Sequence, residues 1–412
     1  MDKLIVGPLI RSQVSTVIMI DALDECTDCE PASAILSVLG QFVAGIQQKA
    51  KFFVTGRPEP RIQKGFRLLV RTAGEFVLHE VKPTQVDRDI RLFFRHKLME
   101  LGGIQDVVDV WPTEEQLNTL CDRAGGFFVY AMATVRFVAQ KRHYPKEQLD
   151  LLLQSPGSKF EGSTRLKEED NQTLDSLYIS ILLEAFGDDD PKDNPDVRST
   201  LGAVVLAINP LSPSAIAALM DLDPGHVFRL LSSVRSLLVL GGDVDQPVRP
   251  FHKSFTDFIV DSTRCGNPRF HFSPPDQHAQ LVVGCLELMN RTLEKNMCHL
   301  PEAVLNSDIS DMTEKTKYIN QALQYACRSW HVHFTHGYHA ASKITSKITV
   351  ALREFLETKF LFWLEVLSVL GSVRNAVDAL QAVVRRLEVR QIFVVVFVEI
   401  PEAFFRSHPR LT

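Results

Sequence analysis

Two patterns of apolar residues divide the chain. In the first 60 residues, short apolar runs at Val17–Ile20 and Phe52–Val54 have the length and composition of strands. Between them, Ala34–Gln48 predicts a helix, because its apolar residues recur at intervals of three and four. A helix that joins two strands predicts a parallel pair. From about residue 83 onward the helical spacing dominates, so we expect an α/β region followed by a mainly α region.

Polar residues follow each predicted strand directly. Asp21, Asp24 and Glu25 come after the first strand, and Thr55 and Arg57 come after the second. The carboxyl ends of parallel strands meet at one edge of a sheet, so we expect Arg57 close to Asp21. A carboxylate there can hold Mg²⁺, and a fixed cation can bind a γ-phosphate. This pattern is typical of the Walker B element of a nucleotidase; the alternative is a strand that ends in an acidic turn.

The motifs VIMIDALDEC (residues 17–26) and KFFVTGRPEPRI (residues 51–62) resemble the NACHT nucleotidases, in the nephrocystin-like branch that is abundant in fungi. The resemblance implies a STAND-type P-loop NTPase fold that binds ATP or ADP with Mg²⁺. It makes Asp21 the Mg²⁺-linked acid, Asp24 and Glu25 the additional catalytic acids, and Thr55 and Arg57 the sensor residues. The family motif TSRPE reads TGRPE here. Such proteins hold ADP in a closed state and oligomerise with ATP, with little turnover.

The family also has a P-loop, GxxGxGK[ST], upstream of Walker B, and no such motif precedes residue 17. The backbone amides and lysine of that loop make most of the phosphate contacts. We therefore expect residues 1–82 to be a partial nucleotidase core with weak or no independent ATP binding. The strand beside the sensor strand is missing too, and we expect Phe76–Leu78 to close onto the open edge of residues 52–54.

Residues 83–153 predict a helical segment. A helix starts near Thr84, and TEEQ at Thr113 has the form of a capping box. The glycine pair Gly125–Gly126 then precedes an apolar helix. The resemblance places this pair near the adenine of a bound nucleotide, whereas the alternative is a plain core helix after a turn.

A polar linker with one helix, residues 154–195, precedes a predicted winged helix at residues 196–265. Three helices, the last capped by Asp223, lead to a short hairpin and a closing helix. The motif FHKSFTDF (residues 251–258) matches the NACHT winged helix, so the resemblance implies that His252 touches the β-phosphate of ADP. The alternative is a structural histidine. DNA reading is disfavoured because the third helix has few cations and the hairpin is acidic.

Residues 266–388 predict a helical domain. The run WHVHFTHGYH (residues 330–339) holds four histidines, for which a transition-metal site and a helix end with exposed histidines are the two interpretations. Residues 389–412 form an atypical tail with a β-prone apolar run.

Composition limits the partners. The formal charge of -5 over 412 residues argues against a general nucleic-acid binder. No stretch is apolar and long enough for a bilayer span. Seven scattered cysteines and the lack of a signal peptide indicate a reduced, cytoplasmic protein. Cys26 and Cys29 form a single CxxC, which falls short of the four ligands of structural zinc. We expect protein partners or self-association, and the alternative function is a nucleotide-independent helical scaffold for protein interaction.

Overall fold

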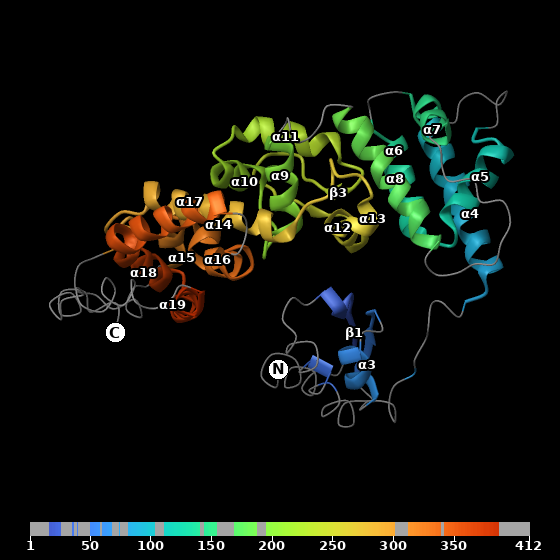
Figure 1. Ribbon diagram of the computed structural model, residues 1–412. Helices are drawn as coiled ribbons and strands as arrows, with labels where there is room; N and C mark the ends of the chain where they lie inside the picture. The colour runs from blue at the N-terminus through green and yellow to red at the C-terminus, as the bar shows by residue number, and fades with distance from the viewer. Residues whose placement is uncertain are drawn as a thin grey trace. The chain divides into compact units, whose positions relative to one another are not determined.

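The computed structural model shows a mainly helical chain with one small parallel sheet (Figure 1). The chain forms two compact units, Met1–Lys82 and Pro83–Thr412, which we call unit 1 and unit 2. The structure describes residues 16–25, 35–36, 39, 50–57, 60–67, 74, 81–103, 111–140, 144–154, 169–187, 195–300, 312–338 and 342–386. No helix within these ranges is both long and apolar enough to cross a bilayer.

Unit 1 contains a parallel pair of strands, as the sequence predicts. Strand β1 (Thr16–Ile20) lies beside β2 (Ala50–Val54), with Ile20 opposite Val54. A short 3₁₀ turn, η2 (Leu23–Glu25), follows β1, and α3 (Pro60–Arg67) follows β2. One face of the pair packs on a small core of four buried residues, Leu23, Leu36, Leu39 and Ile62.

The other face of the strand pair is exposed, although both strands are apolar in sequence. Met19 is 69% exposed and its neighbour across the strand pair, Phe53, is 55% exposed; Val17 is exposed as well. Successive strand residues point to opposite faces, and the core of four covers only one of them. Among the described residues β2 pairs with β1 alone. The segment expected to close its edge, Phe76–Leu78, lies outside the described residues, as do Cys26, Cys29 and residues 389–412.

Unit 2 begins with five helices. They are α4 (Pro83–Gly102), α5 (Glu114–Ala124), α6 (Phe128–Val138), α7 (Pro145–Gln154) and α8 (Glu169–Phe186). The predicted capping box is confirmed: Thr113 Oγ1 accepts a hydrogen bond from the amide of Gln116, and the Gln116 side chain accepts one from the amide of Thr113. The apolar spacing of α4 buries Ile90, Phe94 and Leu98.

The next segment has the predicted order of helices and strands; we call residues 195–265 the hairpin segment. It comprises α9 (Pro195–Leu206), α10 (Pro213–Met220), α11 (Pro224–Ser233), β3 (Leu238–Val239), β4 (Arg249–Pro250), α12 (Lys253–Val260) and α13 (Ser262–Cys265). The two strands pair antiparallel. Asp223 caps α11 by accepting a hydrogen bond from the amide of His226 at 2.7 Å.

The remaining described residues are helical. They form α14 (Pro274–Thr292), α15 (Met312–Lys315), η5 (Thr316–Tyr318), α16 (Gln321–Gly337), α17 (Ser342–Glu354), the π-helical turn η6 (Phe355–Lys359), α18 (Phe360–Val369) and α19 (Arg374–Arg386). Trp330, Phe355 and Trp363 meet edge to face at the centre of this group. Such aromatic pairs combine large buried areas with a fixed geometry.

The histidines of the run on α16 differ in burial, since His336 is exposed and His333 is not. His333 is completely buried, so the interpretation as a helix end with exposed histidines is wrong for this residue. Its helical position faces α14, where His278 accepts or donates a hydrogen bond at 2.8 Å. Within the described part of the chain, no group of three or more histidine, cysteine or carboxylate side chains is placed to hold a metal ion.

Candidate functional site

The candidate site lies where the two parallel strands end. Because Ile20 lies opposite Val54, the next residues, Asp21 and Thr55, are neighbours. The amide of Thr55 donates to the carbonyl of Ile20 at 2.9 Å, which extends the pairing by one residue. The Thr55 hydroxyl donates a short hydrogen bond to Asp21 Oδ1 and accepts one from the amide of Ala22 at 2.9 Å. Thr55 therefore fixes the orientation of an exposed carboxylate.

Arg57 and Asp24 form the second contact of the site. The amide of Arg57 donates to Asp24 Oδ1 at 3.0 Å, and the Arg57 Nε lies 3.5 Å from Asp24 Oδ2. The carboxylate is 5% exposed, whereas the guanidinium side chain is 45% exposed. The cation predicted to lie near Asp21 is thus at the same sheet edge, but the acid that it contacts is Asp24. A half-exposed guanidinium held by a buried carboxylate can still meet an anion from the solvent side.

Ala22 is a feature that sequence reasoning missed. It lies between the two acids with a φ of 51°, in the left-handed region. For a residue with a Cβ this conformation costs roughly 1–2 kcal/mol. The turn brings the amide of Leu23 to the carbonyl of Thr55, at 2.9 Å, and leads Asp24 back toward Arg57. Glycine or asparagine would have signalled such a turn, and alanine does not.

These residues fit Mg²⁺ in ligand chemistry. The Asp21 carboxylate and the Thr55 hydroxyl offer oxygen atoms, and Mg²⁺ in nucleotide sites is usually held by one or two carboxylates together with phosphate oxygens. Asp21 is exposed, so its second oxygen can meet a hydrated ion. Glu25, the last residue of η2, follows Asp24, but its side chain lies outside the described part of the structure.

The glycine pair Gly125–Gly126 lies in unit 2, at the turn between α5 and α6. Gly125 ends α5 with a φ of 53°, and its amide donates to the carbonyl of Cys121 at 3.2 Å. Gly126 has a φ of 90°. Both conformations favour glycine, so the turn itself accounts for the pair without a ligand.

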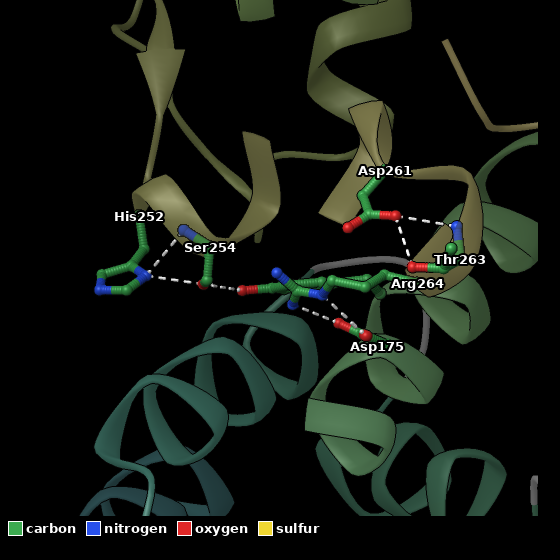
Figure 2. A network of polar contacts seen from close by, with 7 residues as sticks. Asp175, His252, Ser254, Asp261, Thr263 and Arg264 are labelled. Atoms are coloured by element: carbon green, nitrogen blue, oxygen red, sulfur yellow. Dashed lines mark hydrogen bonds and ion pairs between the residues drawn. The ribbon is translucent and has the colours of Figure 1, made fainter. Parts of the chain in front are cut away.

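His252 begins α12, and Figure 2 shows its contacts. The Nδ1 atom accepts a hydrogen bond from the amide of Ser254 at 3.1 Å and lies 2.6 Å from Ser254 Oγ. Ser254 Oγ in turn lies 2.7 Å from the hydroxyl of Tyr178 on α8. His252 therefore caps a helix while its ring remains exposed. The sequence motif gave its position, but the contact with Tyr178 spans 76 residues and no local signal indicates it.

Two further contacts join the preceding helices to the hairpin segment. Asp175 on α8 accepts two hydrogen bonds from the Arg264 guanidinium, at 2.7 and 3.1 Å (Figure 2). Burial raises the pKa of Asp175, although the Arg264 hydrogen bonds act in the opposite direction. Arg136 on α6 donates to the carbonyls of Arg235, Ser236 and Leu238, and its guanidinium lies 4.3 Å from the ring centre of Phe251. These contacts hold α6 and α8 against the hairpin segment.

No protein-family model matches the chain, and no curated protein matches it either. The resemblance to NACHT nucleotidases therefore remains a prediction from the motifs.

Proposed function

We propose that this chain is part of a NACHT-type signalling or assembly switch, with weak or no independent ATP binding. The observation that carries the proposal is the meeting of Asp21, Asp24, Thr55 and Arg57 at the carboxyl end of β1 and β2. Residues from two segments more than 30 positions apart form one cluster of carboxylates, a hydroxyl and a cation. This is the residue chemistry that Mg²⁺ and phosphate groups require.

Each residue has a separate role in this proposal. Asp21 binds the Mg²⁺ ion of a nucleotide, and the ion shields the phosphate charge. Thr55 orients Asp21 through its hydroxyl, and Arg57 offers a half-exposed cation to a phosphate oxygen. Asp24 holds Arg57 in place, and with Glu25 supplies the acids that could orient a water molecule. Arg57 must exchange part of its contact with Asp24 for a phosphate, which makes the cluster responsive to the nucleotide state.

The hairpin segment supports the same proposal from unit 2. Three helices, an antiparallel hairpin and a closing helix follow the order of a winged helix. His252, to which the resemblance assigns a phosphate contact, lies at the start of the closing helix with an exposed ring. We interpret residues 266–388 as the helical domain that follows the winged helix in such switches.

Calorimetry with Mg²⁺ and ATP or ADP tests the proposal. The comparison uses the whole chain, Asp21→Asn, which keeps the shape of the side chain and removes its charge, and Asp89→Asn as a control. Asp89 is an exposed acid on α4 in unit 2. Measurable Mg²⁺-dependent binding that Asp21→Asn abolishes and Asp89→Asn retains supports the switch. Equal binding in all three proteins overturns the role of Asp21, and the absence of binding favours the scaffold described below.

The alternative is a helical scaffold that binds protein without a nucleotide. It is favoured by an exposed apolar stripe on the last described helix and the turn before it, where Val373, Val377 and Val384 are all exposed. These residues recur at helical spacing on one side of α19, away from its buried residues Ala376, Ala379 and Val383. If nucleotide binding is absent, this stripe is the first surface to substitute.

A further inference from the structure

The hydrogen bonds that link His252, Ser254 and Tyr178 have one consistent direction. The amide of Ser254 can only donate, so the Nδ1 atom that accepts from it at 3.1 Å carries no proton. The proton of the neutral ring is then on Nε2. Ser254 Oγ lies 2.6 Å from the same Nδ1 and must donate to it. Its oxygen therefore accepts from the Tyr178 hydroxyl at 2.7 Å, and the chain runs from Tyr178 through Ser254 to His252.

The first two members of this chain are buried and held in place. Tyr178 is almost completely buried, and its ring packs against Phe255 and Phe258 with ring centres 5.4 and 5.3 Å away. Burial raises the pKa of Tyr178 to about 12, so the hydroxyl keeps its proton over the whole physiological range. Ser254 is also buried. A buried hydroxyl without a partner is costly, which favours the one arrangement in which all three groups are bonded.

Tyr178 belongs to α8 and not to the hairpin segment. A second contact holds the same part of α8, because Asp175, three residues before Tyr178, pairs with Arg264 of α13 (Figure 2). The donor that orders His252 is thus supplied by a helix that packs on α12 and α13. If α8 moved away, the Ser254 oxygen would lose the hydrogen bond from Tyr178. The Ser254 hydroxyl proton would then be able to point away from His252.

We propose that Tyr178 and the Ser254 hydroxyl are positioning residues that reinforce the His252 tautomer with its proton on Nε2, so that docking of α8 strengthens the preference for the hydrogen bond His252 offers to a phosphate oxygen. The tautomer part stands on the geometry alone, and the phosphate part rests on the function proposed above. A neutral N–H donor binds a phosphate oxygen directionally. The presence of this N–H donor would then depend on whether α8 is docked, which makes the phosphate contact a point of regulation.

The test is a ¹⁵N spectrum of the whole chain labelled at histidine, with His252→Gln used to assign the His252 signals. A fixed Nε2–H tautomer gives widely separated shifts for the two ring nitrogens, and a mixture gives averaged shifts. Ser254→Ala should lower the ratio of the Nε2–H tautomer to the Nδ1–H tautomer by roughly fivefold, the factor that one ordinary hydrogen bond supplies. Tyr178→Phe keeps the ring packing and should lower it by about twofold, because it removes one cooperative bond from the chain.

Tyr325→Phe is the matched control, because it removes another buried tyrosine hydroxyl that is bonded to a histidine, His333. It should leave the His252 signals unchanged. Averaged shifts in the unmodified chain, or shifts that neither Ser254→Ala nor Tyr178→Phe alters, would overturn the positioning role. Addition of Mg²⁺ and ADP then separates the two proposals. A fixed tautomer whose signals ADP does not move keeps the positioning role and rules out the phosphate contact.

Discussion

Two polar clusters in this chain contain similar numbers of titratable groups and are built in opposite ways. Asp21, Asp24, Thr55 and Arg57 lie at the open end of two short strands in unit 1. In unit 2, His278 on α14 bonds His333 on α16 at 2.8 Å, and His333 bonds Tyr325 at 2.6 Å. The Tyr325 oxygen also accepts a hydrogen bond from the amide of Ile208 at 3.1 Å.

The two clusters differ in formal charge and in exposure to solvent. The strand-end cluster holds formal charges, with one carboxylate exposed and one guanidinium half exposed, so solvent or a ligand can replace a partner at small cost. The histidine cluster is neutral and enclosed by helices, and burial is the main cause that lowers the pKa of His278 to about 4 and of His333 to about 3. The first cluster is suited to binding, whereas the second stabilises a helix contact.

The sharpest test of the tight packing in unit 2 is Gly284→Ala on α14. A Cβ at this position would lie 2.2 Å from the carbonyl oxygen of Leu219, a backbone atom of α10. Since neither helix backbone can yield locally, we expect a loss of about 3 kcal/mol or more in the free energy of unfolding. Urea unfolding followed by tryptophan fluorescence measures it, because all three tryptophans lie in unit 2.

Gly242→Ala is the control for the helix-contact substitution. Gly242 lies in the turn of the hairpin, and a Cβ there would have no atom within 4 Å. Its unfolding midpoint should stay close to that of the unmodified chain. Equal losses in both variants would show that the effect comes from replacing glycine and not from the approach of α14 to α10.

The histidine cluster predicts that unit 2 loses stability as the pH falls from 6.5 to 5.5. Both folded-state pKa values are depressed below the unfolded value of about 6.5, so the unfolded chain binds protons first. The stability is fully present above pH 6.5 and decreases as the pH falls toward the folded values. Together the two histidines lower the free energy of unfolding by about 2 kcal/mol over this interval.

Urea unfolding at a series of pH values measures this slope, again by tryptophan fluorescence. Replacement of both residues, H278Q with H333Q, should flatten the slope between pH 6.5 and 5.5, whatever its effect on stability at pH 7.5. A slope that persists in the double variant would assign the proton uptake to other groups.

At the strand end, removal of the Thr55 hydroxyl should have a smaller effect. Thr55→Val leaves Asp21 and the amide of Ala22 without their shared partner. Water can replace it at Asp21, which is exposed, so we expect a local loss of about 1 kcal/mol. Amide hydrogen exchange of residues 50–57, measured by mass spectrometry, should then be roughly fivefold faster. Thr55→Ser keeps the hydroxyl and should restore the protection; a rate unchanged in Thr55→Val would remove Thr55 from the site.

Local signals predicted much of the fold. The caps at Thr113 and Asp223 and the parallel strand pair all follow from short-range patterns. The proximity of the strand-end residues was also predictable, because parallel strands place their carboxyl ends at one edge of the sheet. These features depend on spacing within about 20 residues or on one topological rule.

Contacts between distant residues were not predictable. Tyr178 meets Ser254, Arg136 meets the carbonyls near Ser236, and His278 meets His333 across 55 to 100 residues. Each pairing depends on how helices pack, which periodicity alone does not determine. The exposure of Met19 was not predictable either, because the sequence of an apolar strand does not indicate whether one or both of its faces are covered.

The smallest expected effect is that of Gly56→Ser, which changes TGRPE to the family's TSRPE. A Cβ at Gly56 would lie 3.6 Å from Asp24 and Leu23, an ordinary contact distance, in contrast to the 2.2 Å at Gly284. We expect the free energy of unfolding to fall by less than about 0.5 kcal/mol, and the amide exchange rate of residues 50–57 to change by less than twofold. An open strand end tolerates a side chain where a helix contact does not, so this departure from the motif does not count against the site. A loss as large as that of Gly284→Ala would mean that the strand end is packed as tightly as the helices, and would remove the physical reason for placing a ligand there.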